Sequence, residues 1–268
     1  QPPTCQSEVQ VAWHDGPLGR SLMEAETDLL RRLLADLPPV RDALAIAPQV
    51  YAPVYDHLRR RSRRPNLMVP ASGEGLCGDP GTTPRPDTLV WGIPEALPYP
   101  SGRMDLMVLV HPLEFSRSPY QILAESERVL ASNGRLIVLV FNPLSLFGVA
   151  RSFHRWPSPS SPWAGRFYPG FMVRRMLEST GLVHERTRYL FYRPPVDREG
   201  VLRATRVLER LPKRQRLPLG GVACIQARKE EPGLTLLGPA FREELNQVRA
   251  RGLPAYTMEG MHGPRRHR

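Results

Sequence analysis

Two apolar runs separated by one amphipathic helix constrain the fold of this chain more than any other feature. Residues 104–111 are continuously apolar after Asp105, as is typical of a strand covered on both faces. Residues 118–130 have the apolar spacing of a helix, and residues 135–141 form a second apolar run. A strand, a helix and a strand at this spacing make a βαβ unit, so the sequence predicts two parallel neighbouring strands with a right-handed crossover.

The other periodic segments predict an α/β domain around this unit. We expect strands over residues 43–47, 66–70 and 88–91, and an antiparallel edge hairpin from residues 182–192 and 221–227. We expect helices over residues 18–37, 55–64, 171–181 and 241–251, and a basic helix within residues 194–217. Residues 142–168 are rich in Ser, Pro and Trp, which predicts a loop.

The chain divides into three regions by composition. We expect an N-terminal helical extension over residues 1–37, the α/β domain over residues 38–230, and a basic, disordered tail over residues 231–268. No apolar run approaches the roughly 20 residues that span a bilayer, and no basic segment followed by an apolar one opens the chain. We therefore expect neither a membrane span nor a signal peptide.

The charge balance is strongly basic. The net charge is +11, and nearly all of the positive charge is arginine. Such a surface favours acidic partners such as nucleic acid or anionic lipid, although arginine-biased codon usage would give the same composition. Two arginine-rich helical faces, within residues 59–64 and 203–216, could bind RNA phosphates or could be solvated charge runs.

Three widely spaced cysteines argue against both a disulfide framework and a zinc site. They are Cys5, Cys77 and Cys224. An odd number of thiols fits a reducing compartment, so we expect a cytoplasmic protein without a bound metal.

Three segments in a fixed order resemble one protein family. The first is the loop Gly92-Ile-Pro-Glu-Ala-Leu-Pro, and the second is the strand ending in His111-Pro-Leu-Glu. The third is Glu125-Ser-Glu-Arg-Val-Leu, followed by Asn-Gly and a strand. Together they resemble the type 11 class I S-adenosylmethionine-dependent methyltransferases, and residues 141–148 resemble a poorly characterised bacterial subgroup with a degenerate cofactor motif.

The resemblance implies a Rossmann-like fold, with a mostly parallel seven-stranded sheet and an antiparallel edge hairpin. It also implies that S-adenosylmethionine binds beyond the carboxyl ends of the strands. The implied cofactor-binding residues are Ala47, Gly92, Ile93, Glu95, Ala96, Leu97 and His111. His111 and Asn142 are the candidates for a catalytic role.

Parts of the family pattern are absent. Residues 43–50 contain no glycine where the family has Asp-x-Gly-x-Gly-x-Gly, and Pro48 removes a backbone donor. Ile93 occupies the position of an acidic residue, and residues 68–73 offer no carboxylate for the ribose hydroxyls. Two functions follow: a methyltransferase-like protein of unknown substrate, or an inactive relative that acts as a protein- or RNA-binding module.

Each candidate side chain also has a purely structural interpretation. His111 could cap a strand, Glu114 could begin a turn, and Asn142 before Pro143 is an ordinary turn starter. Glu125 and Arg128 are spaced as a helix surface pair. Four aromatic residues could form a lid over the site or pack on the rim of the core: Trp156, Trp163, Phe167 and Tyr168.

Overall fold

The computed structural model describes residues 16–48, 52–70, 89–153, 165–209 and 217–230. Residues 1–231 form one compact unit, and residues 232–268 are a second unit of which no residue is described. The predicted tail with its helix over 241–251 lies outside the described residues. So do Cys5, Cys77, Trp156 and Trp163.

The first unit is built on a single seven-stranded sheet with the order β3-β2-β1-β4-β5-β7-β6. The first five strands in this order are parallel, and β7 pairs antiparallel with both β5 and β6. The predicted fold, with its antiparallel edge pair, is therefore confirmed. The strands are β1 (Val40–Ile46), β2 (Ser62–Pro70), β3 (Leu89–Gly92), β4 (Met104–Val110), β5 (Leu130–Phe141), β6 (Leu182–Leu190) and β7 (Val222–Lys229).

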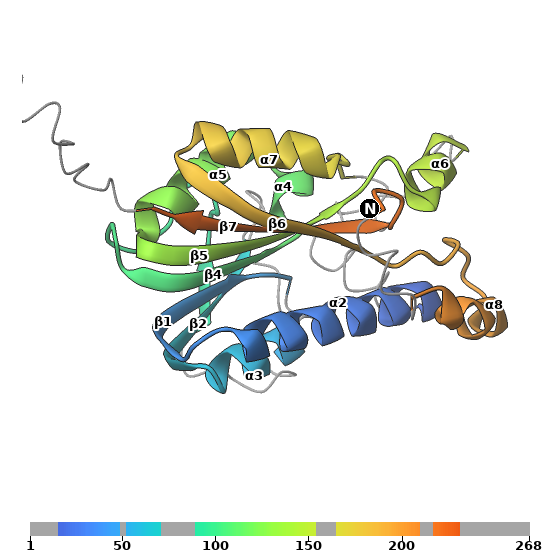
Figure 1. Ribbon diagram of the computed structural model, residues 1–268, viewed down its shortest axis with the longest axis horizontal. Helices are drawn as coiled ribbons and strands as arrows, with labels where there is room; N and C mark the ends of the chain where they lie inside the picture. The colour runs from blue at the N-terminus through green and yellow to red at the C-terminus, as the bar shows by residue number, and fades with distance from the viewer. Residues whose placement is uncertain (1–15, 49–51, 71–88, 154–164, 210–216, 231–268) are drawn as a thin grey trace, which may run out of the picture. The chain divides into compact units, whose positions relative to one another are not determined.

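Helices cover both faces of the sheet (Figure 1). Helices α2 (Pro17–Asp36) and α3 (Ala52–Arg59) lie on one face, and α5 (Pro119–Val129) and α7 (Gly170–Ser179) lie on the other. The alternation along β1 divides its side chains between the faces, since Ala45 joins the α2 cluster and Leu44 the α5 cluster. Because every strand of the βαβ unit is covered on both sides, its sequence is almost wholly apolar.

Helix α2 is the longest described helix and is fixed by a leucine stripe. Pro17 begins it, where a missing N–H costs nothing. Leu22, Leu30 and Leu34 are almost fully buried. Each buried leucine stabilises the fold by about 1.5–3 kcal/mol. A helix anchored in this way holds its other inward-facing side chains at fixed positions on the sheet.

The prediction of a helix over residues 55–64 is wrong in its second half. Helix α3 ends at Arg59, and β2 already begins at Ser62, which pairs with Val40. Pro65 explains the difference, because the residue before a proline is sterically pushed out of the helical region and into extended backbone. Arg63 and Arg64 therefore belong to a strand and not to a basic helical face.

The prediction of a loop over residues 142–168 is also incomplete. Helix α6 (Leu146–Phe153) lies within this segment and follows β5. A further short helix, the single-turn α4 (Pro112–Phe115), follows β4 outside this segment. Phe147 anchors α6 by an edge-on contact with Phe191, with ring centroids 5.4 Å apart. The basic helix expected within residues 194–217 is α8 (Glu199–Ala204), continued by the 3-10 turn η3 (Thr205–Glu209).

Candidate functional site

The carboxyl ends of the parallel strands meet at one edge of the sheet, and several predicted site residues lie there. Ala47 directly follows β1, and Gly92 ends β3. His111 directly follows β4, and Asn142 directly follows β5. Since β1 and β4 are neighbours, Ala47 and His111 occupy adjacent strand ends. In sheets of this kind ligands bind beyond this edge.

His111 is held in an unusual backbone conformation. Its φ of 58° and ψ of 24° place it in the left-handed region, which few residues other than glycine and asparagine adopt. The turn is closed by Pro112, which begins α4. This conformation turns the chain sharply at the end of β4 and leaves the imidazole 96% buried. Such strain at the mouth of a site is retained where the surroundings fix it.

The imidazole of His111 lies between two carboxylates. Its Nε2 is 2.8 Å from Oε1 of Glu26 on α2, and its Nδ1 is 2.7 Å from Oε1 of Glu114 on α4. Both carboxylates are buried. A neutral imidazole carries only one N–H, so two contacts of this length are best satisfied by an imidazolium that donates to both oxygens. We call these three residues the carboxylate–histidine cluster.

The surroundings of His111 raise its pKa. Burial by itself lowers the pKa, but the negative charges of Glu26 and Glu114 and their hydrogen bonds outweigh it and raise the pKa of His111 to about 10. The imidazole is therefore protonated at neutral pH. Whether it takes part in catalysis stays a prediction, and its environment suits an electrostatic role better than that of a general base.

Glu114 connects the cluster to the end of β5. Its Oε1 also accepts the backbone N–H of Phe141 at 2.8 Å, while its Oε2 is buried and accepts no hydrogen bond within the described residues. An unpaired buried carboxylate oxygen is costly, so this atom can accept a hydrogen bond from a further group. A role at the start of a turn therefore does not explain the hydrogen bonds that the Glu114 side chain makes with His111 and with the N–H of Phe141.

Glu26 was not among the predicted site residues. It lies four residues after Leu22 and four before Leu30, in the middle of the apolar stripe of α2. A carboxylate on the buried face of an amphipathic helix is unfavourable unless it has a partner. That misplaced charge was the signal in the sequence, but its partner His111 is 85 residues away along the chain.

Aromatic rings cover the cluster. The ring of Phe141 stacks on the imidazole of His111, with centroids 4.2 Å apart. The ring of Phe167 stacks in turn on the ring of Phe141, with centroids 5.2 Å apart. The guanidinium of Arg151 lies 4.8 Å from the centre of the Phe167 ring. Tyr168 is buried, and its N–H donates to the carbonyl of Phe141. Within the described residues, Phe167 and Tyr168 therefore pack on the rim of the core.

Asn142 uses its whole amide to hold a turn. Its Nδ2 donates to the carbonyls of Pro218 and Gly220, each at 2.9 Å, and its Oδ1 accepts the N–H of Leu144 at 3.2 Å. It is fully buried. The structure thus gives Asn142 three structural contacts, while a contact with substrate stays a prediction.

The loop of residues 92–97 is fixed from outside by two charged residues. Oε2 of Glu125 accepts the N–H of Leu97 at 3.0 Å, and Nη2 of Arg128 donates to the carbonyl of Leu97 at 3.1 Å. The hydrogen bond from Arg128 is the main reason why the pKa of Glu125 is lowered. The predicted helix surface pair therefore also positions this loop.

Other residues of the same loop differ in exposure. Ile93 is 53% exposed, Leu97 is buried, and the N–H of Ala96 donates to the carbonyl of Ile93. Oε1 of Glu95 accepts a short hydrogen bond from Oγ of Ser116, so its carboxylate is tied to the end of α4. The loop is therefore held both by a hydrogen bond within it and by contacts with neighbouring elements, and Ile93 is exposed to solvent.

The residues present fit S-adenosylmethionine in part. The ordered loop, the small Ala47 and the unpaired oxygen of Glu114 are features that a polar, cationic ligand would use. The end of β2 is different, because it is apolar and the Met68 side chain fills the space over Gly92, where a β-carbon would lie 2.1 Å from Cε of Met68. At the end of β2 the space that a ligand would use is therefore filled by a side chain of the protein.

Several other chemistries find no support in the described part of the chain. It contains no group of three or more His, Cys, Asp or Glu side chains placed to hold a metal ion. Cys224 is a free thiol, and burial raises its pKa to about 12, so it is a poor nucleophile. None of the described helices is long and apolar enough to cross a membrane.

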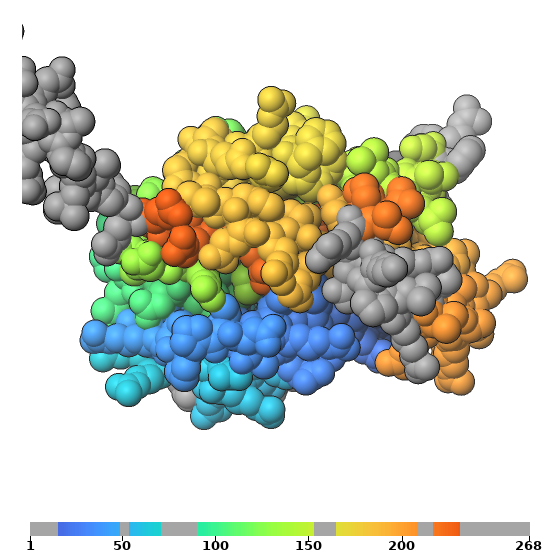
Figure 2. Space-filling model, in the orientation of Figure 1, coloured from blue at the N-terminus to red at the C-terminus, as the bar shows by residue number. Residues whose placement is uncertain are grey.

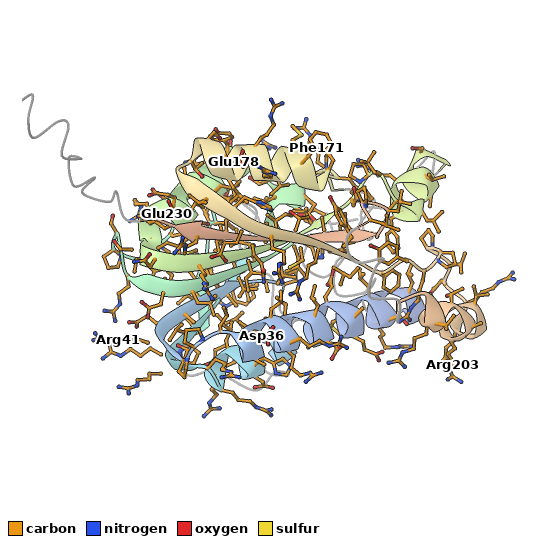
Figure 3. The ribbon with its side chains drawn as sticks, in the orientation of Figure 1. Asp36, Arg41, Phe171, Glu178, Arg203 and Glu230 are labelled. Carbon is orange, nitrogen blue, oxygen red and sulfur yellow. The ribbon has the colours of Figure 1, made fainter. Side chains whose placement is uncertain are left out.

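The two arginine-rich segments are partly engaged within the molecule. Nη2 of Arg61 donates to the carbonyl of Ala35, and Arg203 pairs with Glu199 one turn earlier on α8. Arg203 points away from the body of the unit in Figure 3. Residues 210–216 lie outside the described residues. RNA binding by these segments stays a prediction.

Sequence comparison identifies a methyltransferase segment. Residues 81–138 match the model of a family described as methyltransferase domain. The uncharacterized protein YafS of Escherichia coli K12 is 31% identical over 91 residues, which make up 34% of this chain. The aligned segment spans only 36% of the length of that protein.

Comparison with solved structures supports the same fold. An S-adenosylmethionine-dependent methyltransferase of Thermotoga maritima, titled a possible histamine N-methyltransferase, superposes with a TM-score of 0.52 at 16% identity. The match covers 75% of this chain and 87% of the other. A second similar structure is a chain from the Haloferax volcanii complex between the Trm112 methyltransferase activator and a proposed methyltransferase. It superposes with a TM-score of 0.56 at 13% identity, and the match covers 82% of this chain and 97% of the other.

The chain therefore has the class I methyltransferase fold, and its residues 81–138 match a methyltransferase domain. The carboxylate–histidine cluster and the loop of residues 92–97 lie at the edge where this fold binds its ligand.

Proposed function

We propose that the protein is an S-adenosylmethionine-dependent methyltransferase whose cofactor site lies at the carboxyl edge of the sheet. The carboxylate–histidine cluster carries this proposal. Taking several charges out of water costs several kcal/mol per ion, and titratable groups with strongly shifted pKa values gather at functional sites. A buried cluster of two carboxylates and a histidine whose pKa is strongly raised, at the ligand edge of this fold, is more easily explained by a ligand than by stability alone.

The chain itself supplies binding and positioning. Residues Ala47, Gly92, Ile93, Glu95, Ala96, Leu97 and His111 would hold the cofactor, which supplies an electrophilic methyl group when it is bound. The imidazolium of His111 fixes the middle of α2, the end of β4 and the short helix α4 relative to one another through its two carboxylates. The excess negative charge of these carboxylates favours a cationic ligand beside them.

Methyl transfer is a displacement in which alignment of the two reacting groups does most of the work. An acceptor that already presents a lone pair needs no general base. This suits a site in which His111 is protonated and Asn142 is committed to a turn. The stacked rings of Phe141 and Phe167 cover the cluster and help to exclude water from it.

The second candidate function is that of an inactive relative that binds a protein or RNA. The observation that favours it is the filled space at Gly92, together with the apolar end of β2. A cytoplasmic location is part of either proposal and is supported by the free thiol of Cys224.

Isothermal titration of S-adenosylmethionine into the full chain separates the two functions. The methyltransferase proposal predicts saturable heat with a dissociation constant below the millimolar range, and the same for the demethylated product S-adenosylhomocysteine. Absence of heat at millimolar cofactor, with a folded sample verified by circular dichroism, would refute the proposal and leave the inactive relative.

A further inference from the structure

A cavity of about 160 Å³ lies between the end of α2 and the strands β5, β7 and β6. Its walls carry three arginines, Arg135, Arg186 and Arg188, and two carboxylates, Asp36 and Glu185. We call this cavity the arginine groove. Figure 2 shows α2 in blue running along β6 in gold, on the face turned toward the viewer. The groove has room for a small anion and not merely for one water molecule.

The strand register directs all three arginines to the face of the sheet on which α2 lies. Cys224 of β7 belongs to the core cluster that includes the leucines of α2, and Arg188 of β6 pairs with it. Arg186 lies two residues before Arg188 and therefore on the same face. Arg135 lies two residues before Ile137, which belongs to the same core cluster. Three guanidinium groups from two strands therefore surround one cavity.

Two of these guanidinium groups have no partner among the described residues. The side chains of Arg186 and Arg188 make neither an ion pair nor a hydrogen bond there, whereas Nε of Arg135 lies 4.0 Å from Oε1 of Glu185. Arg188 is half-buried. Burial raises the pKa of Cys224, and the charge of Arg188 opposes that rise, so this guanidinium lies close to the interior. A charge removed from water is costly without an acceptor, so the N–H groups of Arg188 are available to an anion.

We propose that the arginine groove binds a phosphate group, either free or carried by a small organic molecule. A phosphate group carries close to two negative charges at neutral pH and has three acceptor oxygens, so it can satisfy two guanidinium groups at once. Arg186 and Arg188 are two residues apart on one strand, about 7 Å, which two long side chains can bridge to one phosphate. A carboxylate has one charge and two oxygens, which a single guanidinium already satisfies.

The floor of the groove is apolar. Leu33 and Ile137 line it and are buried, and the half-buried Leu37 lies beside them. Ligand sites commonly combine such apolar walls with a few charged groups that fix the orientation of the ligand. The organic part of a phosphate ester would lie on this floor while its phosphate faces the arginines.

The carboxylates around the groove favour a short anion over a nucleic acid. Asp36 lies in the groove itself, and Asp28 lines a second cavity one to two turns earlier on α2. Glu185 and Glu230 both lie beside Arg228. The backbone of an RNA strand would have to pass these negative charges. A single phosphate group meets only the charges of the groove, where arginines outnumber carboxylates.

The arginine groove is separate from the proposed cofactor site. Arg135 lies where the pairing of β5 with β7 begins, and Phe141 at the end of β5 contacts the carboxylate–histidine cluster. Six residues of extended strand separate the two positions, roughly 20 Å. Phosphate binding therefore does not depend on S-adenosylmethionine, and its failure would leave the proposed methyltransferase function untouched.

Calorimetric titration of the full chain at constant ionic strength tests the proposal. The three probes are inorganic phosphate, phenyl phosphate and acetate. Arg188→Gln removes the half-buried guanidinium, and Asp36→Asn removes a carboxylate of the groove. The matched control Arg175→Gln removes an exposed arginine of α7, which covers the other face of the sheet. Thermal unfolding shows whether each variant is folded.

The proposal predicts saturable binding of phosphate and weaker binding of acetate. Arg188→Gln should weaken phosphate binding about tenfold or more, because a hydrogen bond between charged groups is lost. Asp36→Asn should tighten it severalfold, because a repelling charge is removed. Arg175→Gln should bind as the wild type does. Tighter binding of phenyl phosphate than of phosphate would identify an organic phosphate as the ligand, and equal binding would identify phosphate itself.

Three results would each overturn the proposal. The first is the absence of saturable phosphate binding at low ionic strength, including the case in which tRNA binds and Arg188→Gln abolishes that binding. The second is equal binding of acetate and phosphate. The third is an equal effect of Arg188→Gln and Arg175→Gln. A gain of affinity in Asp36→Asn cannot come from misfolding, so it supports the groove even if Arg188→Gln is unstable.

Discussion

Replacement of Glu26 by Gln tests the charged state of the carboxylate–histidine cluster. The amide keeps the size of the side chain but removes one of the two negative charges that raise the pKa of His111 to about 10. A lost hydrogen bond to a charged, buried group costs about 1.5–3 kcal/mol, so Glu26→Gln should lower the free energy of unfolding by roughly that amount at pH 7. Glu24→Gln, an exposed change on the same helix, is the matched control.

The wild-type protein should also lose stability as the pH rises from 7 to 9. Folding raises the pKa of His111 from its ordinary value of 6.5 to about 10. The stabilisation that protonated His111 gives is therefore complete below pH 6.5 and is lost as the pH rises through about 10. Within this window the free energy of unfolding falls by about 1.4 kcal/mol per pH unit. The loss from pH 7 to pH 9 is roughly 2–3 kcal/mol, or about 5–10 °C in Tm.

Among the described residues, no other group with a clearly shifted pKa titrates between pH 7 and pH 9. Burial raises the pKa of Cys224 from 9, so its effect begins only above pH 9. His57 and His184 have lowered pKa values, mainly through burial, and act below their ordinary 6.5. In Glu26→Gln the fall in Tm between pH 7 and pH 9 should be smaller. A wild-type Tm that stays constant over this range, or equal behaviour of Glu26→Gln and Glu24→Gln, would refute the charged cluster.

Substitutions at three positions test the loop and the turn, and a gel-shift assay tests the arginine segments. Ile93→Asp restores the acidic residue of the family at an exposed position, and should tighten S-adenosylmethionine binding about tenfold in calorimetry, whereas Ile93→Asn should give less; equal affinities would contradict the placement of the loop. Arg128→Gln should release the carbonyl of Leu97 and weaken cofactor binding with little change in Tm, and unchanged affinity would count against its positioning role. Asn142→Ala leaves the carbonyl of Pro218 and the buried carbonyl of Gly220 without their donor and should cost about 1–3 kcal/mol in urea unfolding; a stability equal to that of the wild type would contradict its role in the turn. If the arginine segments bind RNA, tRNA should shift in a gel at low salt and be released as salt rises, and no shift at low salt would exclude it.

The sequence was most informative where a local pattern decides the structure. The apolar runs of β4 and β5 and the helix between them could be recognised because buried parallel strands are almost wholly apolar. His111 could be singled out because it ends such a strand. The antiparallel pairing of β6 and β7 also followed from short alternating segments at the end of the domain.

The sequence was least informative where distant residues decide the structure. Glu26 becomes part of the site only through its contact with His111, and nothing in α2 indicates that partner. The arginine run at residues 59–64 looked helical, but pairing of Ser62 with β1 makes its second half a strand. Helix α6 was hidden in a segment rich in Pro and Ser, and it is anchored by Phe191 from beyond β6.

Photo-crosslinking with S-adenosylmethionine labelled in its methyl group tests the central claim most directly, because it reports both binding and position. The full chain is irradiated with the labelled cofactor, digested and mapped by mass spectrometry. The account predicts label on peptides that contain residues 92–97 or His111, and its loss when unlabelled S-adenosylhomocysteine is in excess. Label confined to other peptides, or none that the competitor displaces, would contradict a cofactor site at the carboxyl edge of the sheet.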